Sequence, residues 1–269
     1  QQENQTKEEQ IQAEQEAENN LNELILILLL AYGLSLKRIR SILAQVFGRF
    51  EAQTSLELMK YNRLQNVTQW IMDDLNEAHK QNKKALKSGL LDLYQKVYQD
   101  TASILKVNAL DIGKKEINEI IQSKITDLSL NDRLERMRRR SLLSLKQQLI
   151  KGIKAGDTFE KLSQRIKQSI DQDARKIRTI ARTEAHRLIN QAKMDVANQS
   201  FDPRLLKVWD GTLDNRIRPA HMHLDGTAIP IYSNFISMNG GYGPAPGMMH
   251  NASDDVNCRC VLRFALAGQ

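Results

Sequence analysis

The hydrophobic positions of the first 200 residues recur at helical spacing. Between residues 56 and 78 apolar side chains return every three or four residues, and a second stripe runs from about 86 to 110. Shorter stripes follow at about 117–128, 132–150, 157–170 and 174–200. This part of the chain has no proline and is rich in Leu, Ile, Lys, Gln and Glu, which lose little side-chain freedom in a helix. The pattern predicts one helix after another.

One apolar run departs from this one-sided pattern. Leu24–Leu36 holds 13 residues without a charge, and residues 24–30 are apolar on every side of a helix. A membrane-spanning helix needs about 20 such residues, so we expect no membrane span. We interpret residues 21–36 as a core helix or as a helix at a subunit interface, through which the chain could form an oligomer.

The pattern changes after Asp202-Pro203. We expect strands at Leu205–Trp209, Thr227–Tyr232 and Val256–Leu266, and a short helix that begins at Pro219. A loop rich in Gly, Pro, Asn and Ser fills residues 233–254. The predicted fold class is mainly α, with a long helical N-terminal region followed by a small α+β C-terminal module at about 203–269. A core of about 65 residues is small, so we expect the helical part or a metal to support the module.

Charge is distributed unevenly over this chain of net charge +7. Residues 1–20 carry six Glu and one Lys, which predicts an acidic tail or a frayed helix with little to bury. Between Arg133 and Lys193 the balance reverses, with 17 Lys or Arg against 6 acidic residues. Four arginines form the densest point: Arg136, Arg138, Arg139 and Arg140. One interpretation is a solvated helical face; the other is a surface that contacts DNA without reading its sequence.

The C-terminal module contains a set of potential metal ligands. Cys258 and Cys260 are the only cysteines, and on an extended chain their side chains share one face. Thiolates and imidazoles are the ligands that Zn²⁺ prefers. His221 shares a helix face with Leu224 and is expected to point inward, whereas His223 is expected to face solvent; His250 lies in the long loop. We therefore predict a zinc site made of His221, His250, Cys258 and Cys260, the alternative being ordinary buried residues.

A longer set of motifs resembles a known family. The sequence has Arg182-Thr-Glu184 on a helix, then Trp209-x-x-Thr-x-Asp214-x-Arg216-x-Arg218-Pro-x-His221, and finally Asn257-Cys-Arg-Cys260. This combination, over about residues 150–265, is similar to the phage Mu protein F-like family of minor head, or head morphogenesis, proteins. The resemblance implies a low-copy protein of the virion, inside or on the phage head and made in the host bacterial cytoplasm. It further implies association with the portal, capsid or scaffold proteins and with DNA.

The resemblance also suggests a division of the chain and a role for its motif residues. After the acidic tail, residues 21–150 would form a helical region for portal or capsid contact or for self-association, and residues 151–269 the Mu F-like domain. Trp209 offers a large core side chain, and we expect ion pairs that involve Arg182, Glu184, Asp214, Arg216 and Arg218. A catalytic role is not established for the family, so we expect no enzyme. The alternative is a metal-dependent nuclease or toxin-like enzyme in which Asp214, His221 and a metal activate water.

Overall fold

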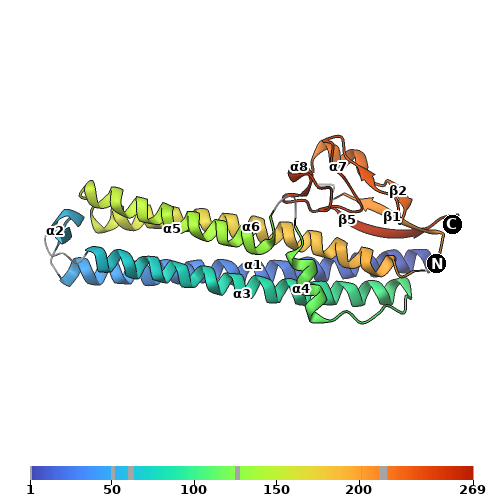
Figure 1. Cartoon of the computed structure of the whole chain (residues 1–269), viewed down its shortest axis with the longest axis horizontal. Helices are drawn as coiled ribbons and strands as arrows, with labels where there is room; N and C mark the ends of the chain where they lie inside the picture. The colour runs from blue at the N-terminus through green and yellow to red at the C-terminus, as the bar shows by residue number, and fades with distance from the viewer. Residues whose placement is uncertain are drawn as a thin grey trace. The chain divides into compact units, whose positions relative to one another are not determined.

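The computed structural model describes residues 2–49, 52–59, 64–124, 128–200, 202–211 and 217–268. The fold is mainly α with a small strand-containing module at the C-terminal end, as the sequence predicts (Figure 1). The helices are α1 (Gln2–Arg49), α2 (Ser55–Met59), α3 (Leu64–Leu105), α4 (Lys114–Gln122), α5 (Leu130–Lys154), α6 (Phe159–Ala197), α7 (Pro219–Leu224) and α8 (Ala252–Asp255). The strands are β1 (Leu205–Asp210), β2 (Ala228–Pro230), β3 (Phe235–Ile236), β4 (Tyr242–Gly243) and β5 (Val261–Leu266).

Several predicted helices are parts of longer ones. The two predicted helices at 157–170 and 174–200 are one continuous helix, α6, because Asp171 and Asp173 keep helical geometry instead of capping a new helix.

The chain divides into two units, and α1, α3 and α6 each contribute a segment to both. Unit 1 comprises residues 1–24, 87–130 and 179–269; unit 2 comprises residues 25–86 and 131–178. Among the described helices, none combines the length and apolarity that a bilayer crossing requires.

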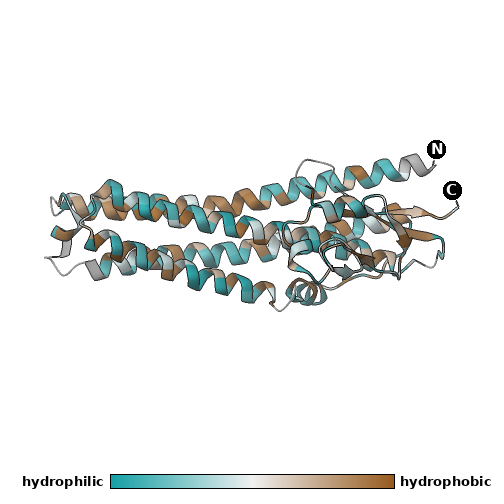
Figure 2. Cartoon of the chain, turned by 90° about the horizontal axis from the view of Figure 1, so that it is seen from above, coloured by the Kyte–Doolittle hydropathy of each residue, from teal (hydrophilic) through white to brown (hydrophobic). Residues whose placement is uncertain are grey.

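Unit 2 is a bundle of helical segments. α1 lies beside α3 and α5 beside α6 (Figure 1). The helices carry both hydrophobic and hydrophilic residues along their length (Figure 2). The buried apolar residues of unit 2 include Leu28, Ile39, Leu43, Ile71, Leu75, Leu145, Leu149, Ile166 and Ile170. Burying one face of each helix in this way supplies the main driving force for the bundle.

A buried polar layer crosses the core of unit 2. It takes one residue from each of the four long helices: Tyr32, His79, Ser141 and Asp173. The Tyr32 hydroxyl lies 3.1 Å from His79 Nδ1, and the Ser141 hydroxyl donates to Asp173 Oδ1 at 2.6 Å. Burial lowers the pKa of His79 to about 4, so the ring is neutral in the folded bundle. The layer favours one register of the four helices, because a shifted register leaves these polar groups unpartnered.

Unit 1 holds the α+β module. Its three-stranded sheet has the order β2-β1-β5 with antiparallel pairing, and β3 and β4 form a separate hairpin. Trp209 on β1 is fully buried, and the module's core extends onto Met194 and Ala197 of α6. The helical part therefore supports the small module, as expected from its size.

The outer edge of β5 is satisfied by helix side chains instead of a further strand. Gln10 of α1 accepts from the Phe264 N–H at 2.9 Å and donates to the Phe264 carbonyl at 3.2 Å. On α6, Asn190 accepts from the Leu262 N–H at 2.8 Å and Lys193 donates to the Leu262 carbonyl at 2.7 Å. These contacts meet the hydrogen-bonding need of an edge strand, which otherwise attracts other chains.

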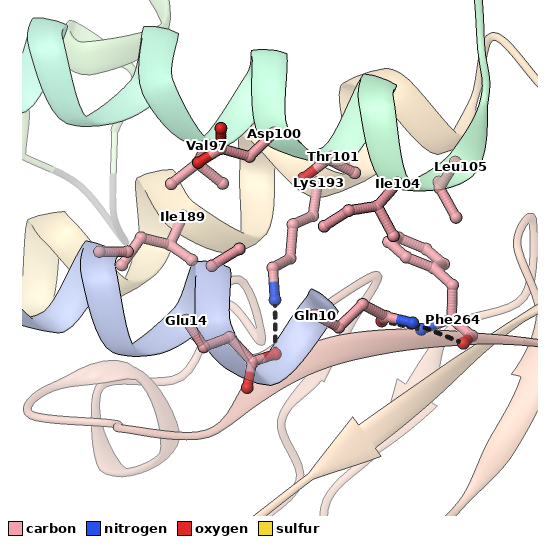
Figure 3. A pocket seen from close by; sticks show the side chains of 12 residues that line it. Gln10, Glu14, Val97, Asp100, Thr101, Ile104, Leu105, Ile189, Lys193 and Phe264 are labelled. Atoms are coloured by element: carbon pink, nitrogen blue, oxygen red, sulfur yellow. Dashed lines mark hydrogen bonds and ion pairs between the residues drawn. The ribbon is translucent and has the colours of Figure 1, made fainter. Parts of the chain in front are cut away.

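The first turns of α1 are part of this packing. Ala17 is buried, and Glu14 accepts from the ammonium of the buried Lys193 at 2.8 Å (Figure 3). Glu14 also pairs with Arg263 at 2.9 Å. The ion pair borders a small cavity of about 20 Å³, which Gln10, Ile104 and Phe264 also line. These contacts replace the expectation of an acidic tail with little to bury. Glu14 and Gln10 are polar, but their partners are the buried Lys193 of α6 and residues of β5.

Glu14 provides a test of this packing. We expect Glu14→Gln to destabilise unit 1 by about 3 kcal/mol, since it leaves the buried Lys193 ammonium without its carboxylate. Glu16→Gln is the matched control: Glu16 is exposed and pairs at 3.2 Å with the half-exposed Lys96, so the cost should be below about 0.5 kcal/mol. Chemical denaturation of both variants measures the difference, and equal stabilities would contradict the role given to α1.

Candidate metal centre

The two cysteines lie just before the last strand. The predicted strand from Val256 is shorter in the structure, because Asn257 has a left-handed backbone with φ 56° and β5 begins only at Val261. The Asn257 N–H donates to the Thr183 hydroxyl of α6 at 3.0 Å, which fixes this turn. Cys258 and Cys260 follow, 2% and 3% exposed, with both sulfurs near one histidine.

His221 is the third member of the cluster. Pro219 starts α7 as predicted, and His221 is 2% exposed, whereas His223 is exposed. His221 Nδ1 lies 3.6 Å from Cys258 Sγ and 3.4 Å from Cys260 Sγ, and the three potential ligand atoms all lie within 4.8 Å of one another. One imidazole nitrogen and two sulfurs at this spacing match three corners of a tetrahedral zinc site.

The other ring nitrogen of His221 faces a buried carboxylate. His221 Nε2 lies 3.3 Å from Asp254 Oδ1, and Asp254 is fully buried at the end of α8. The same oxygen accepts from the Ser237 hydroxyl at 2.9 Å and from the Asn239 amide at 2.8 Å. A carboxylate that accepts from one ring nitrogen leaves the other as a lone-pair donor, and metal-binding histidines commonly have this arrangement. Asp254 thus orients Nδ1 toward the sulfurs.

The electrostatics of the two thiols differ. The pKa of Cys260 is lowered, mainly by a hydrogen bond from the Cys258 thiol and further by His221 and the Trp209 indole. The pKa of Cys258 is raised by that same hydrogen bond and by burial. Trp209 also packs edge-on against the His221 ring, with centroids 5.3 Å apart. The cluster therefore favours one thiolate even without a metal, and a cation would favour the second.

The other predicted ligand, His250, stands apart from this cluster. His250 is exposed, with a left-handed backbone of φ 54°, and the structure does not bring it to the three ligands. Asp214 and Arg216 lie outside the described residues. Arg218 donates to the main-chain carbonyls of Asp254 and Val256, and so holds α8 against the segment that leads to Cys258.

The motif residue Glu184 and its neighbours Arg187 and Asn190 make buried polar contacts on α6. Glu184 is fully buried and pairs with Arg187 at 3.1 Å, whose guanidinium also donates to the Ile120 and Ile121 carbonyls at the end of α4. Asn190 donates to the carbonyls of Cys260 and Pro246, at 3.1 Å and 3.0 Å. One face of α6 therefore carries the buried ion pair and the anchor of the Cys260 segment.

Comparisons with known proteins agree with the motifs that line this site. A family model described as phage Mu protein F like protein matches residues 144–263. The chain is also 30% identical over 244 residues to minor head protein GP7 of Bacillus phage SPP1, which covers 87% of this chain and 79% of that protein. The chain belongs to the phage Mu protein F-like family of minor head proteins. This membership supports a role in phage head morphogenesis and a location in the virion.

A second similarity involves part of an enzyme. Over 152 residues the minor head protein is 26% identical to NAD(+)--arginine ADP-ribosyltransferase EFV of Enterococcus faecalis, which covers 56% of this chain and 31% of that protein. The matched segment is thus less than a third of the transferase. No solved structure matches the chain.

Sequence reasoning missed two residues that organise the site of this minor head protein. Asp254 orients His221, and Asn190 binds the Cys260 and Leu262 backbone. A signal for Asp254 was present in the sequence. Asp254 and Asp255 directly follow a stretch of 27 residues, from Thr227 to Ser253, that contains no Asp, Glu, Lys or Arg. Asn190 gave no signal, since its partners lie about 70 residues away.

The buried pair on α6 gives a prediction. Arg187→Met should destabilise unit 1 by about 3–5 kcal/mol, because Glu184 then loses its buried cationic partner. Arg178→Met is the control on the same helix, since the Arg178 side chain is exposed, and we expect a change within about 0.5 kcal/mol. Denaturant unfolding of the two variants tests this. If Arg187→Met melts like the control, the pair does not hold α4 against α6.

Proposed function

We propose that this minor head protein associates with the portal or capsid in the interior of the phage head and contacts packaged DNA through unit 2. The observation that carries the proposal is the separation of charge between the two units. Unit 2 has 23 Lys or Arg against 11 Asp or Glu, whereas unit 1 has 16 against 21. A strongly cationic bundle attracts the phosphate backbone and gains affinity by releasing its counterions.

The four predicted arginines differ in how they can serve this contact. Arg138 and Arg139 donate to the Glu135 carboxylate at 2.7–2.9 Å, and these bonds lower the pKa of Glu135 to about 2. Arg138 also donates to Asn76. Arg136 and Arg140 are exposed on α5 and pair with no acid among the described residues. We assign the DNA contact mainly to Arg136 and Arg140.

An apolar strip on α1 supports the proposed self-association. Within the chain, residues 24–30 are buried on one side only, where Leu24, Ile25 and Leu28 lie. Leu26, Ile27, Leu30 and Leu34 are 46–66% exposed and return at helical spacing. In our proposal this strip packs against a second copy of the chain, as contiguous exposed apolar side chains commonly do in oligomers.

We further propose that the cluster of His221, Cys258 and Cys260 binds Zn²⁺ in a structural role. The donor set and the Asp254 carboxylate behind His221 support this. The three residues are 2–3% exposed, which suits a closed site and leaves little access for a substrate. This burial does not favour the alternative of a metal-dependent nuclease.

The DNA contact is tested by the salt dependence of binding. We expect Arg136→Gln with Arg140→Gln to weaken binding to duplex DNA and to lower the slope of log affinity against log salt by about 1.8, or about 0.9 for each phosphate contact. Arg138→Gln with Arg139→Gln should change the slope less, because these two guanidiniums already donate to the Glu135 carboxylate and are less available to phosphate. Equal slopes for the first double variant and the wild type would move the DNA contact to another surface.

The metal proposal is tested by elemental analysis and melting. We expect one Zn²⁺ per purified chain, and a chelator should lower the melting temperature, since metal binding contributes to folding free energy. His221→Ala and Cys258→Ser should lose the metal, whereas His223→Ala, a change of an exposed histidine on the same helix, should retain it. A metal-free wild type with chelator-insensitive melting would leave the two cysteines as ordinary core residues.

A further inference from the structure

The longest uncharged stretch of the sequence lies in the α+β module. Thr227 to Ser253 contains no Asp, Glu, Lys or Arg in 27 residues, although 26% of the chain is charged. About seven charged residues would be expected there from the composition alone. Surfaces that contact only water tolerate charged residues, whereas the centres of protein–protein interfaces are depleted in charged residues.

The β3–β4 hairpin presents apolar side chains from this stretch. Ile236 and Tyr242 are cross-strand partners, so their side chains lie side by side on one face. They are 68% and 56% exposed, and Met238 at the hairpin turn is 73% exposed. We call Ile236, Met238 and Tyr242 the hairpin surface. Isoleucine, methionine and tyrosine together form the kind of patch that interfaces use as an anchor.

The inner face of the hairpin is firmly held. Phe235 is buried against the Trp209 ring, with centroids 5.2 Å apart. The fully buried Asp254 carboxylate accepts from Ser237 and from Asn239, on either side of Met238. Gly243 is required for the close approach of the backbone, because a Cβ there would lie 1.8 Å from the Met248 carbonyl oxygen. The hairpin surface is therefore fixed before any partner binds, which reduces the entropy lost on binding.

We propose that the hairpin surface docks into an apolar, uncharged pocket on a different protein of the phage head. The inference rests on the proposed association with the portal or capsid and names the surface that makes it. Nucleic acid does not fit, because no cation lies within the 27 residues to pair with phosphate. In our proposal a second copy packs against the apolar strip on α1, so the hairpin surface is left for a different protein.

The test uses the full chain in particles of the phage that encodes it. The hairpin variant combines Ile236→Ser, Met238→Ser and Tyr242→Ser. The control is Leu143→Ser, which removes an apolar side chain that is 57% exposed on α5. We expect at least tenfold fewer copies of the hairpin variant per particle than of the wild type, and no more than a twofold change for the control. Equal incorporation of the hairpin variant would overturn the proposal.

A second measurement avoids any question of folding. A photo-crosslinking residue replaces Met238 alone, and the particles are irradiated and digested for mass spectrometry. The expected product joins residue 238 to a segment of another head protein that lacks charged residues. A cross-link to a second copy, to DNA or to a charged segment, or no cross-link in particles that contain the chain, would overturn the proposal. Absence of the wild type from particles would instead refute the proposed association itself.

Discussion

The unpaired edge of β5 is the constraint on which unit 1 depends. β5 has β1 on one side only, so its outer N–H and C=O groups need partners that no described strand supplies. Gln10, Asn190 and Lys193 supply them from two helices, and Lys193 then requires Glu14 because its ammonium is buried. One backbone requirement thus recruits the start of α1 and the end of α6 into the same core. A module too small to be stable alone is completed by helices from the two ends of the helical region.

A single carboxylate connects the candidate metal centre to the hairpin surface. Asp254 Oδ1 faces His221 Nε2 and also accepts from Ser237 and Asn239 at the hairpin turn. The geometry of His221 and the shape of the hairpin therefore share one anchor. A metal on Nδ1 would strengthen the hydrogen bond from Nε2 to this carboxylate, because ligation makes the ring N–H more acidic. Metal binding in our proposal would thereby rigidify a docking surface that itself holds no metal ligand.

The sequence allowed prediction of those features that depend on neighbours in the chain. Helical spacing predicts the helices, Pro219 predicts the start of α7, and the shared face of Leu224 predicts that His221 points inward while His223 is exposed. Features set by distant partners could not be predicted. The acidic first turns resemble a tail because Gln10 and Glu14 find their partners about 250 residues later. His250 has a suitable side chain, but the left-handed backbone at that residue is decided by the packing of the loop and not by local composition.

The chain combines two surfaces of different chemistry, one basic and one apolar. The basic residues of unit 2 suit a polyanion such as DNA. Binding of this kind weakens as the salt concentration rises, because the release of counterions from the phosphates then contributes less free energy. The hairpin surface has no charge to screen, and apolar burial is little affected by moderate salt. If both proposed contacts exist, the protein would remain attached to its protein partner under ionic conditions that weaken its binding to DNA. The position of each surface in a different unit makes the two contacts separable by mutation, since the arginines of α5 and the residues of the hairpin share no side-chain partner among the described residues.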